Sequence, residues 1–275
     1  STKNIVLIVF SLIFYAWGEP LWILLLLFSS FFNWFIGILI GKFRDTPRAK
    51  LAVGGGILVD ILLLLIFKYS AFIVENLNAV SGAAIPVPQI TLPIGISFYT
   101  FQMAAYLIEI SRGSLAPETS LLRLAAGLLM FPKLISGPLV EWNGMSRQLR
   151  RRPYRAGAFD CGLREFVLEL GLELLLADRI GGLWTQLANI GYESVSAPLA
   201  WLGLLAYSLQ LYFDFYGYSK MAVGLGRMIG FSLPENFAHP YAARSMTEFW
   251  RRWHVTLSAW FRDYVYIPLG GGRRG

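Results

Sequence analysis

Long apolar stretches recur along this chain, and they constrain its fold more than any other feature of the sequence. Only 15% of its 275 residues are charged, against about 25% in an ordinary soluble domain. A helix needs about 20 mostly apolar residues to cross a bilayer. The sequence therefore predicts an all-α, multi-pass transmembrane helical bundle. The expected spans are 20–41, 51–74, 92–111, 160–180 and 199–226, with a shorter stretch at 4–17.

The basic residues predict how these spans are oriented. The net charge of +7 is spread over short clusters between the apolar stretches, which argues against nucleic acid as a partner. Loops rich in Lys and Arg tend to stay in the cytoplasm, whereas 75–91 and 191–198 carry no base and are expected outside. The clusters expected on the cytoplasmic side are Lys42–Lys50, Arg112, Arg147–Arg155 and Arg244–Arg274.

The segment 121–140 lies between two of these basic clusters, so both of its ends are expected on one side of the membrane. It contains Gly127, Pro132, Gly137 and Pro138, which interrupt a regular helix. Such backbone is tolerated in a membrane only where protein or water surrounds it. The sequence therefore predicts a re-entrant or broken helix in this segment.

We expect residues 1–275 to form one membrane-embedded domain. Apolar sequence begins directly after Ser1 and the chain stops in a glycine-rich loop, so we expect the domain to be truncated at both ends. Cys161 is the only cysteine, which excludes an intrachain disulfide and a cysteine-based metal site. We expect its thiol to be buried and inert.

A single carboxylate, Asp214, lies in the middle of the apolar stretch 199–226. A carboxylate at that depth is costly unless it faces the bundle interior and finds partners. At helical spacing Tyr207, Gln210 and Tyr218 share its face, so we expect a polar stripe turned inward. This stripe is either a structural hydrogen-bond network between helices or a direct part of a functional site.

The segment 249–264 is the densest group of aromatic and charged residues. Read as one helix, it has an aromatic stripe and a second face on which Arg251, Ser258 and Arg262 lie near one another. One interpretation is an interfacial helix with aromatic rings at headgroup level. The other places His254 at a cavity, where it accepts a proton from a hydroxyl while arginines hold an anionic co-substrate.

The remaining motifs favour packing and turns over chemistry. His239 lies in a turn-like sequence, and two histidines without a carboxylate at ligand spacing make no metal site. The glycines of Gly224–Gly230 superficially match a dinucleotide loop, but no strand precedes them, so we expect them to allow close helix packing. No Gly-x-Ser-x-Gly motif supports a serine hydrolase.

Several short motifs follow one another from residue 92 to the end of the chain. They are Leu92–Gln102, Phe131–Pro138, Tyr212–Ser219, Pro234–Phe237, Glu248–Ser258, Arg262–Tyr264 and Ile267–Gly271. In this order they resemble the membrane-bound O-acyltransferase family. The likeness is closest to its alginate O-acetyltransferase branch.

This resemblance implies an enzyme, an O-acyltransferase of the bacterial inner membrane. It implies transfer of an acyl group, acetyl in this branch, from a cytoplasmic thioester toward the hydroxyl of an extracytoplasmic polysaccharide such as alginate. Acetyl-CoA or another acyl thioester is the implied co-substrate, with no bound cofactor and no metal. The implied partners are the lipid bilayer and periplasmic acetyltransferase or polysaccharide-secretion proteins.

The resemblance also implies roles for individual residues. His254 matches the first of two histidines of the family's active centre. The second, the principal catalytic histidine, lies in a Trp-His-Gly motif that we expect beyond residue 275, so we expect this chain to be inactive alone. The implied substrate-binding or supporting residues are Asp214, Arg251, Arg252, Trp253, Ser258, Arg262 and Asp263.

Two other functions use the same features. A transporter or flippase would move an acyl carrier or polysaccharide along a central path without making a bond. A structural subunit of a secretion complex would need neither Asp214 nor the broken segment, which are costly in a membrane.

Overall fold

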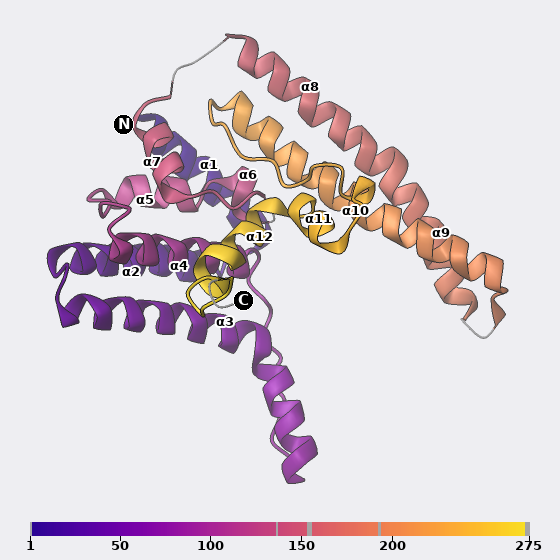
Figure 1. Ribbon diagram of the computed structural model, residues 1–275, viewed down its shortest axis with the longest axis horizontal. Coiled ribbons are helices and arrows are strands. Elements are labelled where there is room, and N and C mark those ends of the chain that lie inside the picture. The colour runs from indigo at the N-terminus through magenta and orange to yellow at the C-terminus, as the bar shows by residue number, and fades with distance from the viewer. Residues whose placement is uncertain (1, 136, 153–155, 192–193, 273–275) are drawn as a thin grey trace. The chain divides into compact units, whose positions relative to one another are not determined.

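The computed structural model describes residues 2–135, 137–152, 156–191 and 194–272, and all regular elements in these ranges are helices (Figure 1). The all-α class is thereby confirmed. Arg155, Arg273 and Arg274 of the expected basic clusters lie outside the described residues. The chain divides into two compact units, each described below by itself, and the single domain stays a prediction. The N-terminal unit comprises Ser1–Ile135, Leu139–Arg151 and Tyr264–Gly275, and the C-terminal unit comprises Ser136–Pro138 and Arg152–Asp263.

Seven helices of the N-terminal unit follow the predicted spans and the predicted break. The expected stretches 4–17 and 51–74 are helical throughout, and 20–41 and 92–111 are helical from Ile23 and from Ile96 onward. The elements are α1 (Thr2–Gly18), α2 (Ile23–Lys42), α3 (Pro47–Ser81), α4 (Ile96–Arg112), α5 (Leu121–Leu128), α6 (Phe131–Leu134) and α7 (Trp142–Arg150).

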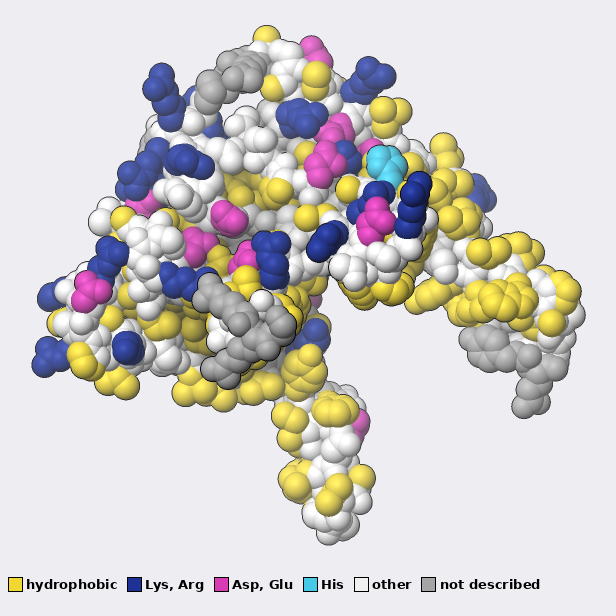
Figure 2. Space-filling model, viewed as in Figure 1, with side chains coloured by type: hydrophobic (Ala, Val, Ile, Leu, Met, Phe, Trp, Pro, Cys, Tyr) yellow, Lys and Arg dark blue, Asp and Glu magenta, His cyan; other side chains and the backbone are white. Residues whose placement is uncertain are grey.

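Helix α3 extends beyond the predicted span 51–74 at both ends, to a start signal at Pro47 and a stop signal at Gly82. Pro47 occupies its first turn, and Gly82 ends it in the left-handed conformation at φ 68°. By length and composition, α2 and α3 are able to cross a membrane. The end of α3 projects from the other helices of this unit, and apolar side chains are exposed along it (Figures 1 and 2), among them Phe72 and Val80.

The expected break in segment 121–140 is confirmed, since α5 ends at Leu128 and α6 is a single short turn. Ser120 caps α5 by accepting a hydrogen bond from the amide of Arg123 at 3.3 Å. The amide of Phe131, which begins α6, donates to Ser11 Oγ of α1 at 3.1 Å. The broken backbone is thus held by a side chain of another helix.

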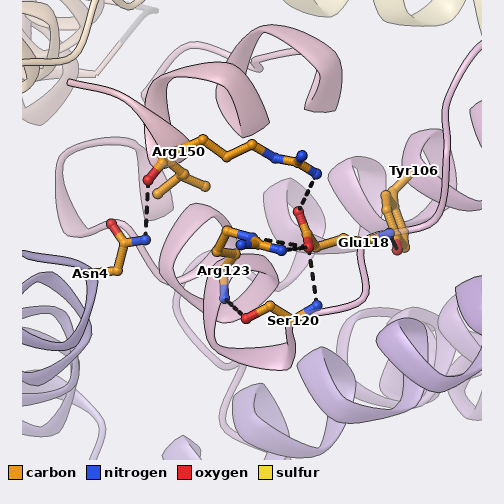
Figure 3. A network of polar contacts seen from close by, with 7 residues as sticks. Asn4, Tyr106, Glu118, Ser120, Arg123 and Arg150 are labelled. Carbon is orange, nitrogen blue, oxygen red and sulfur yellow. Dashed lines mark hydrogen bonds and ion pairs between the residues drawn. The ribbon is translucent and has the colours of Figure 1, made fainter. Parts of the chain in front are cut away.

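Glu118, between α4 and α5, is the centre of a polar network (Figure 3). Its side chain is 1% exposed, and it accepts hydrogen bonds from Arg123 at 2.7 Å and from the amide of Ser120 at 3.0 Å. Arg150 of α7 lies 3.5 Å from its second oxygen. Burial favours the neutral acid, but these donors outweigh it and hold the pKa of Glu118 below its usual range. The network ties α7 to the loop before α5.

A second buried acid, Asp60 of α3, was not singled out by the sequence analysis. It is 2% exposed and accepts a hydrogen bond from Asn33 Nδ2 of α2 at 2.9 Å. The same amide group donates to the carbonyl of Ser29 at 3.1 Å. The side-chain amide of Asn33 therefore links α2 to α3.

The C-terminal unit contains two long helical stretches followed by short helices. The expected span 160–180 is part of a longer stretch that passes through a π-helical turn, and the expected span 199–226 is one helix. The elements are α8 (Ala156–Leu172), η1 (Glu173–Ala177), α9 (Asp178–Ile190), α10 (Ala197–Met228), η3 (Pro240–Ala242), α11 (Met246–Arg252), α12 (Val255–Phe261) and η4 (Arg262–Tyr266), whose last residues belong to the N-terminal unit.

Small residues bring α8 and α10 together. A Cβ atom on Gly162 would lie 2.5 Å from the carbonyl oxygen of Gly224, so neither position has room for a side chain. Close packing is thereby confirmed as the reason for Gly224. Ion pairs from Glu165 to Lys220 (3.6 Å) and Arg227 (2.9 Å) join the same two helices. The thiol of Cys161 is exposed on α8, so the expectation of a buried thiol was wrong.

Candidate functional site

Asp214 of α10 is placed differently from the prediction. It is exposed, as is Tyr207, so the expectation of a polar stripe turned inward was wrong at both positions. At Gly217 a Cβ atom would lie 3.2 Å from the carbonyl oxygen of Glu169, so the backbones of α8 and α10 leave little space there. The exposed Asp214 carboxylate lies near the like charge of Glu173.

The aromatic segment 249–264 is not one helix. Helix α11 ends at Arg252, and His254 adopts the left-handed conformation, with φ 43° and ψ 55°, before α12 begins at Val255. This conformation is uncommon for a residue with a side chain and it redirects the backbone. The expectation that Arg251, Ser258 and Arg262 share one helical face was therefore wrong.

Asn236 holds this break in place. Its backbone carbonyl accepts the amide of Val255 at 2.8 Å. Its side-chain oxygen accepts the hydroxyl of Thr256 at 2.6 Å, and its Nδ2 donates to Ser219 Oγ of α10 at 2.9 Å. Asn236 and Ser219 are 2% and 1% exposed. The two residues that follow His254 are thus tied, through the backbone and side chain of Asn236, to the long helix α10.

Aromatic rings surround the break. The ring of Phe215 meets that of His254 at 4.8 Å between centroids and 79° between planes. Trp253 packs against Phe237 at 5.1 Å and against Phe249 at 5.6 Å. Such edge-to-face and stacked contacts add stability beyond the buried area. The predicted aromatic character is confirmed, but the rings converge from α10, the loop before η3 and α11 instead of forming one stripe.

Burial determines the protonation of His254. The residue is 7% exposed, and burial lowers the pKa of its imidazole to about 4 because an imidazolium is costly away from water. At neutral pH the ring is therefore uncharged, which is the form that accepts a proton from a hydroxyl.

The predicted arginines lie at different positions around this centre. Arg251 is exposed, whereas Arg252 donates to Glu248 at 2.5 Å and to the carbonyl of His239 at 3.4 Å. The backbone amide of Arg244 donates to Glu248, and together with Arg252 it keeps the pKa of Glu248 below its ordinary value. Arg252 thus fastens α11 to the loop that precedes it.

The other predicted supporting residues fall after the break. The Arg262 guanidinium forms two hydrogen bonds to Asp263, at 2.7 and 2.9 Å, and most of its side chain is exposed. Ser258 of α12 donates its hydroxyl to the carbonyl of Trp253 at 3.3 Å, so its side chain spans the break at His254. The structure therefore brings together His254, Trp253 and Ser258, and it leaves Asp214, Arg251 and Arg262 exposed.

Sequence reasoning assigned no role to Asn236, Ser219 or Thr256. All three stand inside motifs that carry the family resemblance, but an Asn or Ser in a turn or at a helix end is ordinary by itself. Only the folded chain shows that they converge on the two residues after His254.

Comparison with known proteins identifies the class of this helical protein. A profile of the membrane-bound O-acyltransferase family matches residues 111–275, which is more than half of the chain and includes the whole C-terminal unit. The chain therefore belongs to the membrane-bound O-acyltransferase family, and it is a membrane protein.

Individual relatives match nearly the whole chain. The probable alginate O-acetylase AlgI of Pseudomonas aeruginosa is 40% identical over 276 residues, which cover 98% of this chain and 53% of the relative. That of Azotobacter vinelandii is 41% identical, covering 98% and 55%. A peptidoglycan O-acetyltransferase of Helicobacter pylori is 33% identical, covering 97% and 56%. The chain thus spans a little over half the length of these relatives.

Proposed function

We propose that this chain is the membrane-embedded part of an O-acyltransferase. The enzyme moves an acyl group, with acetyl as the first candidate, from a cytoplasmic thioester such as acetyl-CoA to the hydroxyl of an extracytoplasmic polysaccharide. Relatives named as alginate O-acetylase and peptidoglycan O-acetyltransferase support transfer to a polysaccharide. Alginate is the first acceptor to test, because several of the relatives carry that name.

The observation that carries this proposal is the buried, uncharged imidazole of His254 at a strained helix break. Strained backbone persists only where its surroundings determine it, and it often marks a functional position. Asn236, which bonds the next residue, and Phe215, whose ring contacts the imidazole, supply that surrounding structure. A purely interfacial helix would need neither the break nor the buried amide.

In the proposed reaction, His254 helps remove the proton of the acceptor hydroxyl. The hydroxyl oxygen then forms a bond to the thioester carbonyl carbon, the carbon–sulfur bond breaks, and the thiolate leaves and takes up a proton. The exposed arginines are suited to the anionic groups of a thioester donor. The residues proposed to bind or support are Asp214, Arg251, Arg252, Trp253, Ser258, Arg262 and Asp263. The reaction belongs to the complete protein, in which a second histidine is expected to act with His254.

The proposed topology is a multi-pass protein of the bacterial inner membrane. The helices α1 to α4, the stretch α8–α9 and helix α10 are proposed to cross the bilayer, and 121–140 is proposed to enter and leave on the cytoplasmic side. The arginines gathered near Glu118 support that side, because basic residues favour the cytoplasm. Periplasmic acetyltransferase or polysaccharide-secretion proteins are the proposed partners.

The test uses the purified complete protein in lipid vesicles, with an acetyl thioester labelled on the acetyl group and alginate oligosaccharides as acceptor. The proposal predicts label in an alkali-labile ester on the sugar, and none with protein-free vesicles. A transporter or flippase would instead move label or sugar across the bilayer with no new ester. Label movement without ester would replace the proposed function with transport.

A further inference from the structure

Helix α3 is longer than a single crossing of a bilayer requires. Its 35 residues extend about 52 Å at 1.5 Å per residue, whereas the hydrocarbon core is about 30 Å thick. The apolar run 51–67 contains one charge, the buried Asp60, and it covers about 26 Å. Lys50 precedes this run and Lys68 follows it, so two bases bracket one crossing. Residues 69–81 of the helix are left over beyond Lys68.

The end of α3 also changes direction. Helix α2, helix α4 and the first part of α3 pack against one another, and Figure 1 shows that the end of α3 lies across their common direction. Lys68 and Tyr69 follow the apolar run, with the Lys68 ammonium 5.7 Å from the centre of the Tyr69 ring. Lysine and tyrosine at this place are typical of the headgroup level. A helix end that lies across the spans at this level runs along the membrane surface.

One exposed apolar stripe runs along both parts of α3. Its members recur every three or four positions, so they share one face of the helix. The first members lie at membrane depth in the proposed topology, where lipid is the surrounding medium, and the same face stays apolar beyond Lys68. At the far end Val80 is 88% exposed. The stripe consists of Leu62, Ile66, Tyr69, Ile73, Leu77 and Val80.

The polar groups of this helix end do not compete with the stripe. Glu75 and Asn78 lie on the opposite side of the helix at helical spacing. Asn78 exchanges two hydrogen bonds with the backbone of Ile85, at 2.8 and 3.0 Å, and so holds the returning chain on that side. Asn76, beside the stripe, donates its side-chain amide to the carbonyl of Phe72 at 2.7 Å. The end of α3 is therefore amphipathic, and its one charge, on Glu75, is turned away from the stripe.

We propose that residues 69–81 form an interfacial helix whose apolar stripe inserts into the outer leaflet of the membrane. This inference rests on the proposed function, in whose topology α3 crosses the bilayer and its end is extracytoplasmic. The partner is lipid, because the stripe is continuous with the face that lipid covers in the span. Interfacial helices bind by burying apolar area and by attraction of basic residues to anionic headgroups. Since residues 69–81 carry no base, insertion depends on the stripe alone and needs no anionic lipid.

The test is the depth of nitroxide labels in the complete protein, reconstituted in phosphatidylcholine nanodiscs. Single cysteines carry the label in a protein whose own cysteines, Cys161 included, are replaced by serine. Oxygen collects in lipid and a nickel chelate in water, so the ratio of their collision rates with a label measures its depth. Labels on the stripe should lie about 5–10 Å into the boundary of headgroups and acyl chains, and labels outside the stripe should stay in contact with water. The stripe variants are Ile73→Cys, Leu77→Cys and Val80→Cys, and the controls are Glu75→Cys and Ala79→Cys.

Stripe labels that collide freely with the nickel chelate would overturn the inference, because the helix end would then lie in water. Stripe labels shielded from both reagents would overturn it in favour of a protein partner. Insertion only after phosphatidylglycerol is added to the nanodiscs would contradict binding by the stripe alone.

A label at Leu62→Cys, in the spanning part of α3, separates this inference from the proposed function. Contact with water there would overturn the crossing of α3 that the proposed function assumes. Contact with lipid there leaves that crossing standing whatever the other labels show. Acetyl transfer by the unlabelled protein in the same nanodiscs tests the proposed function by itself.

Discussion

The backbone carbonyl of Asn236 accepts a 2.8 Å hydrogen bond from the amide of Val255, the first residue of α12. The amide of Val255 thus bonds to Asn236 and not to a residue of α11, at the point where the left-handed conformation of His254 ends the first helix. This bond makes Asn236, which lies 18 residues earlier in the sequence than His254, the residue that sets the position of the imidazole. The relationship leads directly to a mutational test.

Asn236→Ala should lower kcat by about 100-fold, because displacing a reacting group by about an ångström costs that much. Since Asn236 positions His254 and is not proposed to touch substrate, KM should change little. Thr256→Val, which removes only one hydrogen bond to Asn236, should cause a smaller loss of kcat. Steady-state kinetics of the complete protein would measure both, and a rise in KM at constant kcat would show that Asn236 binds substrate instead.

The buried imidazole makes stability depend on pH. Burial holds the pKa of His254 at about 4 in the folded chain, below its ordinary value of about 6.5 in the unfolded chain. Between these values only the unfolded chain binds a proton, so stability is complete above about pH 6.5 and falls as the pH is lowered toward 4. At pH 5 the expected loss is about 2 kcal/mol.

Denaturant unfolding at pH 7.5 and pH 5 measures this difference. His254→Gln should abolish the loss of unfolding free energy that His254 causes between pH 7.5 and pH 5. His239→Gln should keep that loss, because His239 is exposed. The same slope in both variants would mean that His254 titrates normally in the folded protein.

Loss of the Glu118 carboxylate should destabilise the N-terminal unit. Glu118→Gln removes the charge that Arg123 and Arg150 share and should cost about 1–3 kcal/mol of unfolding free energy. Glu75→Gln changes an exposed acid of α3 and should have an effect within about 0.5 kcal/mol. Thermal unfolding of the complete protein in detergent compares the two, and equal midpoints would contradict a structural role for the network.

The contact between α8 and α10 provides a matched pair of glycine variants on one helix. Gly162→Ala puts a Cβ atom 2.5 Å from the carbonyl oxygen of Gly224 and should destabilise the protein by about 1–3 kcal/mol. Gly171→Ala meets open space and should be neutral or stabilising by up to about 1 kcal/mol. The order of the two unfolding midpoints is the measurement, and a Gly162→Ala protein as stable as wild type would mean that α8 and α10 do not pack so closely.

The sequence predicted the parts of this fold that depend on local composition. Apolar runs predicted the positions of α1 to α4 and α10, and the glycines and prolines of 121–140 predicted the break between α5 and α6. The length of α3 was underestimated, because its end after residue 74 is less apolar and is determined by Gly82. Helical periodicity wrongly predicted one continuous helix through His254. Composition does not reveal a single left-handed residue inside a helix-forming sequence.

The sequence named candidate site residues, and the roles of His254, Trp253 and Ser258 stay predictions. Their geometry was not predicted, and the expected inward orientation of Asp214 was wrong. Asp60 and Lys133 escaped notice because one charge in an apolar run reveals neither its burial nor its partners. Those depend on contacts such as Asn33 with Asp60 and Gln102 with Lys133, which join separate helices.

The most direct test of the account is the rate of ester formation from acetyl thioester and polysaccharide by the complete protein, with each histidine of this chain replaced in turn. His254→Ala should lower the rate about 100-fold or more while expression and folding are retained. His239→Ala should stay within about twofold of wild type, because its side chain is exposed. Full activity of the His254→Ala protein would contradict the central claim that this buried imidazole takes part in acyl transfer.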